Sequence, residues 1–426
     1  MIESKTVMGS THSGGNMKKI TVTLMVMLLA IGMVFANAQT EQASAAALGS
    51  AEAPLKVGLI CIGDENDQGY TYNFMRGQRE AQAKLEAEGY NVEWVVKFNT
   101  GEDSTCSDAN IETAEEGCKI VFNNSYGFEP FMLEVAKDYP EVDFVSCTNC
   151  VSSHDDLPNT FNAFANIYEG RYVAGVLAGM KINQMIKEGK ITPDQALIGY
   201  VGAFSFAEVI SGFTSYYLGA KSVCPSVKME VSFVGSWSNA TAEADAAKTL
   251  ADRGAVIISQ HSDNTTPATA AQAAGVFHTG YNNDMTGVAP KASIISTRID
   301  WSIYFYDFIK AYLSGEKLAQ DWSKGMDEKA VVMTELNTAI AAPGSAEKMA
   351  QIMADISSGK IQVFDTSTFT VEGKKLTAAF ARDTNGDFAP DTDEAVFDGA
   401  FHESYFQSAP YFTVKIDGIT WLNEAF

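Results

Sequence analysis

The sequence predicts an α/β protein with two similar halves, each built on a parallel β-sheet covered by helices. Short apolar runs of strand length alternate with segments of helical spacing, which is typical of parallel sheets because their strands are buried on both faces. The alternation begins near Leu55 and starts again after residue 166, so two lobes with a cleft between them are expected. In such sheets a ligand binds beyond the carboxyl ends of the strands.

The first half begins with a buried strand at 56–62, followed by a helix at 72–89. Phe74 and Leu85 fall on one side of this helix, and Gly89 suits its C-cap because glycine tolerates the left-handed conformation. The further elements of this half are strands at 91–96, 119–122 and 143–146 and a helix at 130–139.

The second half repeats the pattern from residue 168 onward. Its expected helices cover 168–185, 208–220, 240–253, 267–274 and 301–313, and its strands cover 196–201, 229–234, 256–259, 276–280 and 293–296. We assign 55–166 with 286–344 to lobe 1, 167–285 to lobe 2, and 345–426 to a C-terminal elaboration with strands at 360–364, 367–371 and 411–416.

The N-terminal segment predicts export from the cytoplasm. Lys18 and Lys19 precede an apolar run at 20–35, and small residues surround Ala38, which is the pattern of a secretory signal peptide. The alternative is a membrane span, because the run approaches spanning length. We therefore treat 1–38 as an N-terminal extension with a signal peptide, and expect a soluble periplasmic or extracellular protein after cleavage near Ala38.

Composition excludes two kinds of partner. The net charge of −23 argues against nucleic acid and against anionic membrane surfaces, because both are bound through lysine and arginine. A hydrophobic share of 46% excludes a disordered chain. We expect the protein to act as a monomer.

The cysteines leave three interpretations open. Cys147 and Cys150 form a CxxC pair, and Cys106 and Cys118 are also close in sequence. An oxidising compartment permits structural disulfides, free thiols are the next interpretation, and metal or redox use is the third. A redox CxxC would open a helix, whereas this pair ends an apolar strand.

No catalytic or nucleotide-binding motif is present in the sequence, so neither enzyme activity nor a cofactor is expected. There is no GxSxG, HExxH, Walker A or dinucleotide GxGxxG pattern. Instead, the loops after the strands carry aromatic rings and carboxylates, which suit a flat, uncharged heterocycle. Asp67, Asp263 and Asp284 supply acceptors from three such loops, while Trp237 either joins the site or covers a hydrophobic edge.

An acidic stretch near the C-terminus has partial calcium-loop spacing. Its positions 1, 3, 5, 9 and 12 hold Asp383, Asn385, Asp387, Asp391 and Glu394. Position 6 is Phe388 where the loop requires glycine, so a solvated acidic turn is the alternative.

From about residue 56 to the end, the chain resembles the BMP (basic membrane protein) family of substrate-binding proteins for ABC importers. The matching stretches are YGF at 126–128, IYEGRYVAGVLAG at 167–179, GSW at 235–237 and QHSD at 260–263. The resemblance implies the type I periplasmic-binding fold, in which two Rossmann-like lobes joined by a hinge close on a purine base or nucleoside. It also implies docking on an ABC permease in the cytoplasmic membrane.

The resemblance carries particular roles onto this chain. The first-loop aspartate of the family falls on Asp67, its stacking aromatics on Tyr70 and on Phe204 or Phe206, and its late aspartate on Asp284. The lysine that binds ribose in nucleoside-binding members is missing from 297–301, which favours a free base, with Trp301 filling the ribose space. Arg298 is the alternative substitute for that lysine.

The expected ligand-binding residues are Asp67, Tyr70, Ser125, Tyr126, Phe204, Phe206, Trp237, His261, Asp263, Asp284 and Trp301. Other ligands, namely a nucleoside, a flavin or a sugar, remain open, as does a sensing role. A secreted nucleoside hydrolase is the competing class, because Asp67, Asp263 and Asp284 could form an acid–base set.

Overall fold

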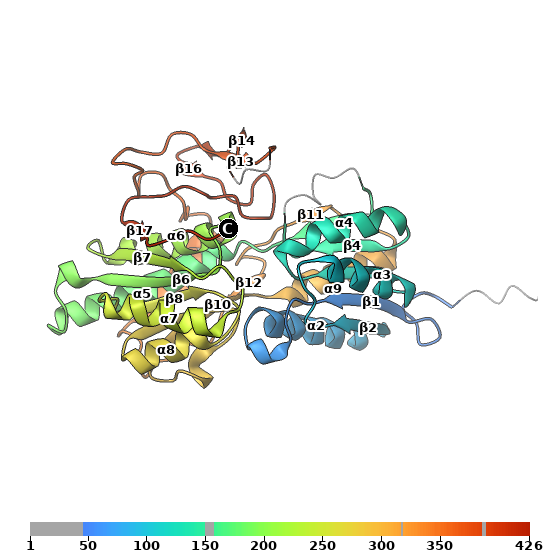
Figure 1. Cartoon of the computed structure of the whole chain (residues 1–426), viewed down its shortest axis with the longest axis horizontal. Helices are drawn as coiled ribbons and strands as arrows, with labels where there is room; N and C mark the ends of the chain where they lie inside the picture. Colours follow the sequence, from blue (N-terminus) through green and yellow to red (C-terminus); the bar gives the residue numbers. More distant parts are fainter. Residues whose placement is uncertain (1–45, 150–156, 317, 386–388) are drawn as a thin grey trace, which may run out of the picture. The chain divides into compact units, whose positions relative to one another are not determined.

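The computed structural model describes residues 46–149, 157–316, 318–385 and 389–426 (Figure 1). The expected signal peptide at 1–38, together with Cys150, Asp387 and Phe388, lies outside these residues. Gly49–Phe426 form one compact unit. Within the described ranges, no helix is both long and apolar enough to cross a bilayer.

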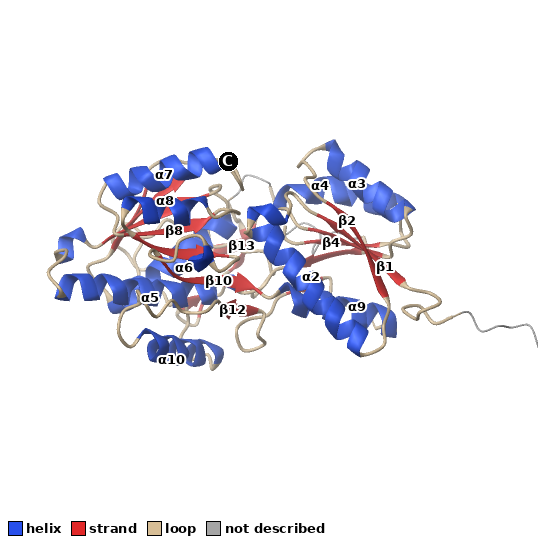
Figure 2. Cartoon of the chain, turned by 90° about the horizontal axis from the view of Figure 1, so that it is seen from below, coloured by secondary structure: helices blue, strands red, loops and turns tan. Residues whose placement is uncertain are grey.

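The first sheet has six parallel strands in the order β11-β5-β4-β3-β1-β2. On one face α2 packs against α9, and on the other face α3 packs against α4 (Figure 2). The strands are β1 (Leu55–Ile60), β2 (Val92–Lys97), β3 (Ile120–Asn123), β4 (Asp143–Ser146), β5 (Thr160–Ala163) and β11 (Asp321–Trp322). The helices are α2 (Tyr70–Ala87), α3 (Ser104–Glu115), α4 (Glu129–Asp138) and α9 (Trp301–Ser314).

The second sheet has seven strands in the order β12-β10-β9-β8-β6-β7-β17. All its pairs are parallel except β10 with β12. The strands are β6 (Leu197–Gly202), β7 (Lys228–Phe233), β8 (Ile257–His261), β9 (Phe277–Tyr281), β10 (Ser293–Ile299), β12 (Val331–Met333) and β17 (Ile419–Trp421). The helices are α5 (Ile167–Lys187), α6 (Ala207–Val223), α7 (Ala240–Asp252), α8 (Thr266–Ala274) and α10 (Ser345–Ser357).

The stretch 286–344, which the sequence assigns to lobe 1, is divided between the two sheets. Strands β10 and β12 pair in the second sheet, whereas β11 pairs in the first and α9 packs on its helix α2. The chain therefore crosses between the lobes repeatedly, which strand-by-strand patterning does not reveal. Helices α3 and α10 and strand β5 were also missing from the sequence-based expectation.

The strands expected at 360–364, 367–371 and 411–416 are wrong. Only isolated bridges occur there, at Asp365 and Val371, and the C-terminal strands lie elsewhere. Apart from β17 they are β13 (Phe380–Arg382), β14 (Thr392–Glu394), β15 (Val396–Phe397) and β16 (Ala400–Phe401). The alternating apolar residues instead pack against one another from segments without regular secondary structure. Phe364, for example, stacks on Phe412 with ring centroids 4.6 Å apart.

The five described cysteines are free and buried, so free thiols are the interpretation, of the three left open, that applies to Cys106 and Cys118. Burial raises the pKa of the Cys106 thiol to about 12 and that of Cys118 to about 11. Burial also raises the pKa of Cys147 well above its usual value. Protonated, inaccessible thiols are unreactive, so these cysteines act as small apolar core residues.

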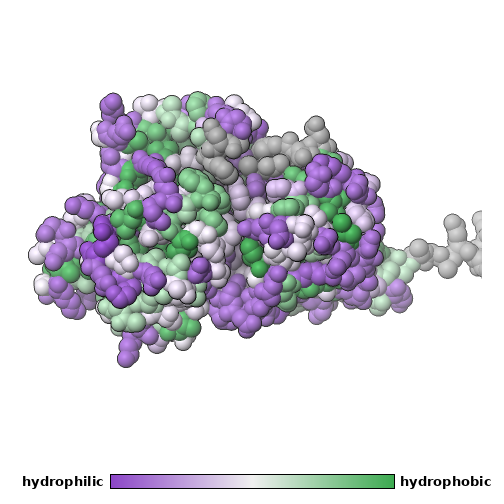
Figure 3. Space-filling view, viewed as in Figure 1, coloured by the Kyte–Doolittle hydropathy of each residue, from purple (hydrophilic) through white to green (hydrophobic). Residues whose placement is uncertain are grey.

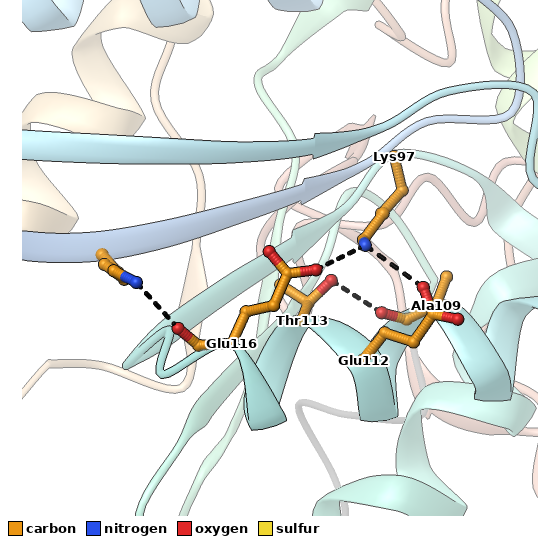
Figure 4. Close-up of polar contacts among 6 residues, drawn as sticks. Lys97, Ala109, Glu112, Thr113 and Glu116 are labelled. Carbon is orange, nitrogen blue, oxygen red and sulfur yellow. Dashed lines mark hydrogen bonds and ion pairs between the residues drawn. The ribbon is translucent and has the colours of Figure 1, made fainter.

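Ion pairs and hydrogen bonds connect polar residues on the outer surface of lobe 1. Lys97, at the end of β2, contacts Glu112 at 3.1 Å and Glu116 at 2.7 Å, and Thr113 donates to the carbonyl oxygen of Ala109 (Figure 4). Because both glutamates are exposed, these ion pairs contribute little to stability. Figure 3 shows the same character more widely, with a mainly hydrophilic exterior interrupted by smaller hydrophobic areas.

Helices α5 and α6 approach closely because glycines face the neighbouring backbone. A Cβ atom built on Gly175 would lie 1.9 Å from the carbonyl oxygen of Tyr216, and one on Gly219 would lie 2.1 Å from that of Tyr172. Backbone atoms cannot move aside as a flexible side chain can. The small residues of the 167–179 stretch therefore fix the distance between these helices.

We expect Gly175→Ala to lower the free energy of unfolding by about 1–3 kcal/mol, because overpacking forces the two helices apart. Urea unfolding followed by circular dichroism measures the change. Gly287→Ala is the matched control, since a Cβ there meets no heavy atom within 4 Å. Equal stability of the two variants would contradict the close-packing argument.

Candidate functional site

A cavity of about 340 Å³ lies where the carboxyl ends of both sheets meet. Its walls come from the loops after β1, β3 and β4 of the first sheet, from the loops after β7 and β8 and the end of β9 in the second, and from the first turns of α2 and α6. The lining residues are Ile62, Tyr70, Asn124, Ser125, Tyr126, Cys147, Thr148, Glu208, Trp237, His261, Asp263 and Tyr281. We call this space the central cavity.

A second cavity of about 660 Å³, which we call the outer cavity, shares Ile62, Trp237 and Asp263 with the first. Its other lining residues are Gly63, Asp67, Thr71, Glu102, Phe204, Gly235, Ser236 and Ser238. Four carboxylates thus line the two cavities, whereas no lysine or arginine of the described chain lines either one.

Asp263 is the carboxylate at the junction of the two cavities. Its side chain is buried, with 8% of the residue exposed, and its backbone N–H donates to the carbonyl oxygen of Trp237 at 2.8 Å. The carboxyl group accepts no hydrogen bond from any residue in the described ranges. Burial raises its pKa well above the usual value, and the nearby Asp67 and Glu208 raise it further. Asp263 is therefore an acceptor available to a ligand.

Asp67 also lines the outer cavity, but its carboxylate is already engaged. It accepts the backbone N–H groups of Gly69, Thr71 and Tyr72 at 2.9, 2.8 and 3.0 Å, at the start of α2. Burial raises its pKa, and these three hydrogen bonds lower it. Asp67 therefore fixes the start of α2 and closes one end of the outer cavity.

His261 and Glu208 form a buried pair beside Asp263. The imidazole Nε2 lies 3.1 Å from Glu208 Oε1, and burial lowers the pKa of the histidine despite that partner. A neutral ring is therefore favoured at neutral pH. The other ring nitrogen, Nδ1, and the Tyr281 hydroxyl are buried without a partner in the described part of the chain. Both His261 and Tyr281 line the central cavity.

The guanidinium of Arg171 lies behind Tyr281, 3.7 Å from the centre of its ring. This buried arginine donates from Nη1 to the carbonyl oxygen of Gln260 at 2.9 Å. It does not line the cavities, but its positive charge adds to burial in lowering the pKa of His261, which does. The arginine also holds the Tyr281 ring in place by a cation–π contact.

Four aromatic rings form a row along the cleft. Tyr126 of lobe 1 stacks on Phe206 of lobe 2 with ring centroids 5.1 Å apart, and Phe206 stacks on Phe204 at 5.0 Å. Phe204 meets the edge of Trp237 at 5.1 Å. Tyr126 and Trp237 line the central cavity, Phe204 lines the outer one, and Phe206 joins the two lobes.

The floor of lobe 1 is held by hydrogen bonds among cavity residues. Tyr70 donates its hydroxyl to the carbonyl oxygen of Cys147 at 2.8 Å, and Ser125 donates to Glu102 at 2.6 Å. Asn124 accepts from the backbone of Ile62 at 2.8 Å, which leaves its buried Nδ2 without a partner among the described residues. That amide can donate to a ligand in the central cavity.

Asp284 and Trp301, both expected at the site, line neither cavity. Asp284 is exposed and accepts the backbone N–H of Thr286 at 2.8 Å. Trp301 is fully buried in the core of lobe 1, with its ring 5.1 Å from that of Phe74 and 6.2 Å from that of Tyr70. Trp301 therefore packs behind Tyr70, which lines the central cavity.

Other cavity residues were missed by the sequence analysis, chiefly Glu102, Asn124, Glu208 and Tyr281. A signal for Asn124 and Tyr281 was present, since Asn124 directly follows β3 and Tyr281 ends β9. The sequence around Glu208 carried no such signal, because acidic residues are common in the first turn of a helix.

The calcium loop stays a prediction. Thr384 donates its hydroxyl to Asp391 at 2.9 Å, the backbone of Asn385 donates to Asp383 at 3.1 Å, and Glu394 accepts from Ala379 at 3.0 Å. Within the described ranges, no three acidic, histidine or cysteine residues group as a metal site. Asp387, the central expected ligand, lies outside them.

Two lobes whose strands end at a shared cavity are typical of a ligand-binding protein. Comparison with known families agrees, since the model described as "ABC transporter substrate-binding protein PnrA-like" matches residues 55–363. The chain belongs to this Bmp family of substrate-binding proteins of ABC transporters, which are not enzymes.

Individual relatives support the same assignment. A purine-binding protein of Brucella abortus is 35% identical over 315 residues, which cover 74% of this chain and 84% of the relative. A nucleoside-binding ABC transporter protein of Lactococcus lactis is 26% identical, over 53% of this chain and 59% of the relative. A solute-binding protein of Aeropyrum pernix has a similar fold, with a TM-score of 0.60 at 16% identity, over 73% of this chain and 93% of its own.

The raised pKa of Asp263 predicts a pH-dependent stability. The unfolded carboxyl has a pKa near about 3.9, so wild-type stability falls as pH rises from there toward the raised folded value. Asp263→Asn removes that loss, and its melting temperature should exceed the wild-type value by an amount that grows with pH. Thermal melts between about pH 4 and pH 8 test this, with Asp284→Asn as the control. A difference that does not change with pH would contradict the assignment.

Proposed function

We propose that this protein captures a purine between its two lobes outside the cytoplasm and delivers it to an ABC importer. Free base is favoured over nucleoside. The proposal rests on one observation above all, the buried carboxyl of Asp263, which has no partner in the described chain and stands between aromatic walls. The relative from Brucella abortus, which is named for purine binding, points the same way.

The charge and shape of the cavities support an uncharged flat ring with N–H groups. Carboxylates and the Asn124 amide offer acceptors and one donor, and the aromatic residues offer faces on which a ring can stack. Phosphate-bearing nucleotides are disfavoured, because arginine and lysine are the usual partners of phosphate groups and neither lines the cavities in the described part of the chain. Only His261 is ionisable to a cation there, and its pKa is lowered.

The preference for a base follows from the residues that could hold ribose. Nucleoside-binding members of the family place a ribose-binding lysine at the position of 297–301, and this chain has no lysine there. Arg298, the alternative substitute, does not line either cavity. A nucleoside is the second candidate, because the outer cavity offers Glu102, Ser236 and Ser238 as partners for hydroxyl groups.

Capture requires no bond chemistry. A ligand that contacts both lobes shifts their open–closed equilibrium by its differential affinity for the closed form. Asp263 and Trp237 belong to lobe 2, whereas Asn124 and Tyr70 belong to lobe 1, so a ligand in the central cavity meets both.

The test is a thermal-shift screen followed by titration calorimetry with adenine, guanine, hypoxanthine, their nucleosides, riboflavin and common sugars. We expect stabilisation by at least one base and a weaker effect of the matching nucleoside. Tighter binding of the nucleoside would move the assignment to the second candidate. A response to sugar or riboflavin alone would reject purine capture.

We further expect Asp263→Asn to weaken binding of the purine identified by the screen by at least about tenfold, since the amide keeps an acceptor oxygen but cannot carry the negative charge that strengthens a hydrogen bond from a ring N–H. The matched control is Asp284→Asn, which changes the same group at an exposed site outside both cavities. Calorimetry measures both variants. Equal affinity of Asp263→Asn and wild type would remove Asp263 from the site.

A further inference from the structure

The C-terminal residues 402–426, which we call the C-terminal strap, lie beyond the part of the chain that the family model matches. They are nevertheless built into the folded unit, since Tyr411, Phe412 and Ile416 are buried in the main hydrophobic cluster.

The end of the strap is fixed to lobe 2. Strand β17 pairs in parallel with β7, and the side chain of Asn423 continues this pairing by bonding both backbone groups of Phe233, at 2.8 and 2.7 Å. Ser205, between the two stacking phenylalanines, bonds the backbone of Ala425 twice, at 2.6 and 3.0 Å. The strap therefore holds the loop that carries Phe204 and Phe206.

The beginning of the strap is fixed to lobe 1. The buried Ser408 donates its backbone N–H to the Asp321 carboxylate of β11 at 2.7 Å, and its hydroxyl bonds the same group. Asn162 of β5 donates to the Ser408 hydroxyl at 2.8 Å. Asn162 in turn accepts from the hydroxyl of Thr148 at 2.9 Å, and Thr148 lines the central cavity.

Three other segments cross between the lobes, and they lie side by side. They run from β5 to α5, from β10 to α9 and from β11 to β12. Backbone hydrogen bonds join them, from Phe164 to Trp322 at 3.1 Å and from Asn166 to Lys324 at 2.9 Å. These segments form the hinge, and the strap is a further crossing.

The strap also walls one side of the cleft. A cavity of about 490 Å³ lies between the Tyr126–Phe206 stack and the C-terminal region, where Gln407, Pro410 and Tyr411 line it. Tyr126 lines both this space and the central cavity, so the two spaces are neighbours. The outer cavity, in contrast, is lined by no residue of the strap.

From these contacts we propose that the C-terminal strap ties both lobes together on one side of the cleft, so that the cleft opens and admits ligand on the side of the outer cavity. Asp321 is the positioning residue of this device, since one carboxylate receives both hydrogen bonds from Ser408. The direction in which the lobes open does not depend on the identity of the ligand, so the inference is independent of purine capture.

Asp321→Ala tests the strap without removing it. Loss of hydrogen bonds to a charged group should shift the ligand-free equilibrium toward open forms by about tenfold. We expect a larger radius of gyration by small-angle X-ray scattering and faster amide hydrogen exchange around Ser408 and Asn162. Asp355→Ala, which removes an exposed ion pair with Lys360 on α10, is the control and should leave both readouts unchanged.

Ser408→Ala is the milder second variant, because it keeps the backbone bond to Asp321. It should change both readouts in the same direction by a smaller amount, and it decides the question if Asp321→Ala does not fold. Folded variants with wild-type scattering and wild-type exchange would overturn the proposal. Neither measurement uses a ligand, so a failure here is distinct from a failure of purine binding.

Discussion

Burial of the Asp263 carboxyl where two sheets meet is the constraint on which the rest of the site depends. A carboxylate removed from water is costly unless it is paired, and no described lysine or arginine lines the cavities to pair it. The neighbouring carboxylates Asp67 and Glu208 add to this cost, and each has partners of its own. Three backbone N–H groups hold Asp67 at the start of α2, His261 partners Glu208, and Arg171 stands behind Tyr281. A ligand that donates a hydrogen bond to Asp263 can therefore bind favourably at the group whose burial lowers the stability of the fold.

The parallel sheets and the loops that line the two cavities were predictable, because strand period and loop position follow from the sequence alone. Asp263 and the aromatic residues after β6 and β7 were found in this way. Asp284 was expected by the same rule but is exposed, since the chain turns outward after β9. Trp301 was placed by analogy with relatives, whereas its burial among Tyr70 and Phe74 depends on packing between helices.

The C-terminal region was the least predictable, and the reason is physical. Alternating apolar residues were interpreted as strands at 360–364 and 411–416, yet Phe364 and Phe412 stack as parts of irregular chain. The same period of two can arise wherever one side of an extended segment is buried. Strand β17 was missed because its pairing with β7 joins residues about two hundred positions apart, which local patterns do not encode.

The position of Trp237 gives the protein a built-in optical reporter. It is the tryptophan, among five in the chain, whose ring borders both cavities, while Trp94, Trp301, Trp322 and Trp421 pack with aromatic neighbours inside one lobe or the other. Occupancy of the cleft changes the polarity around its indole and leaves the surroundings of the other four largely constant. Intrinsic fluorescence can therefore follow binding and release in real time without any attached label.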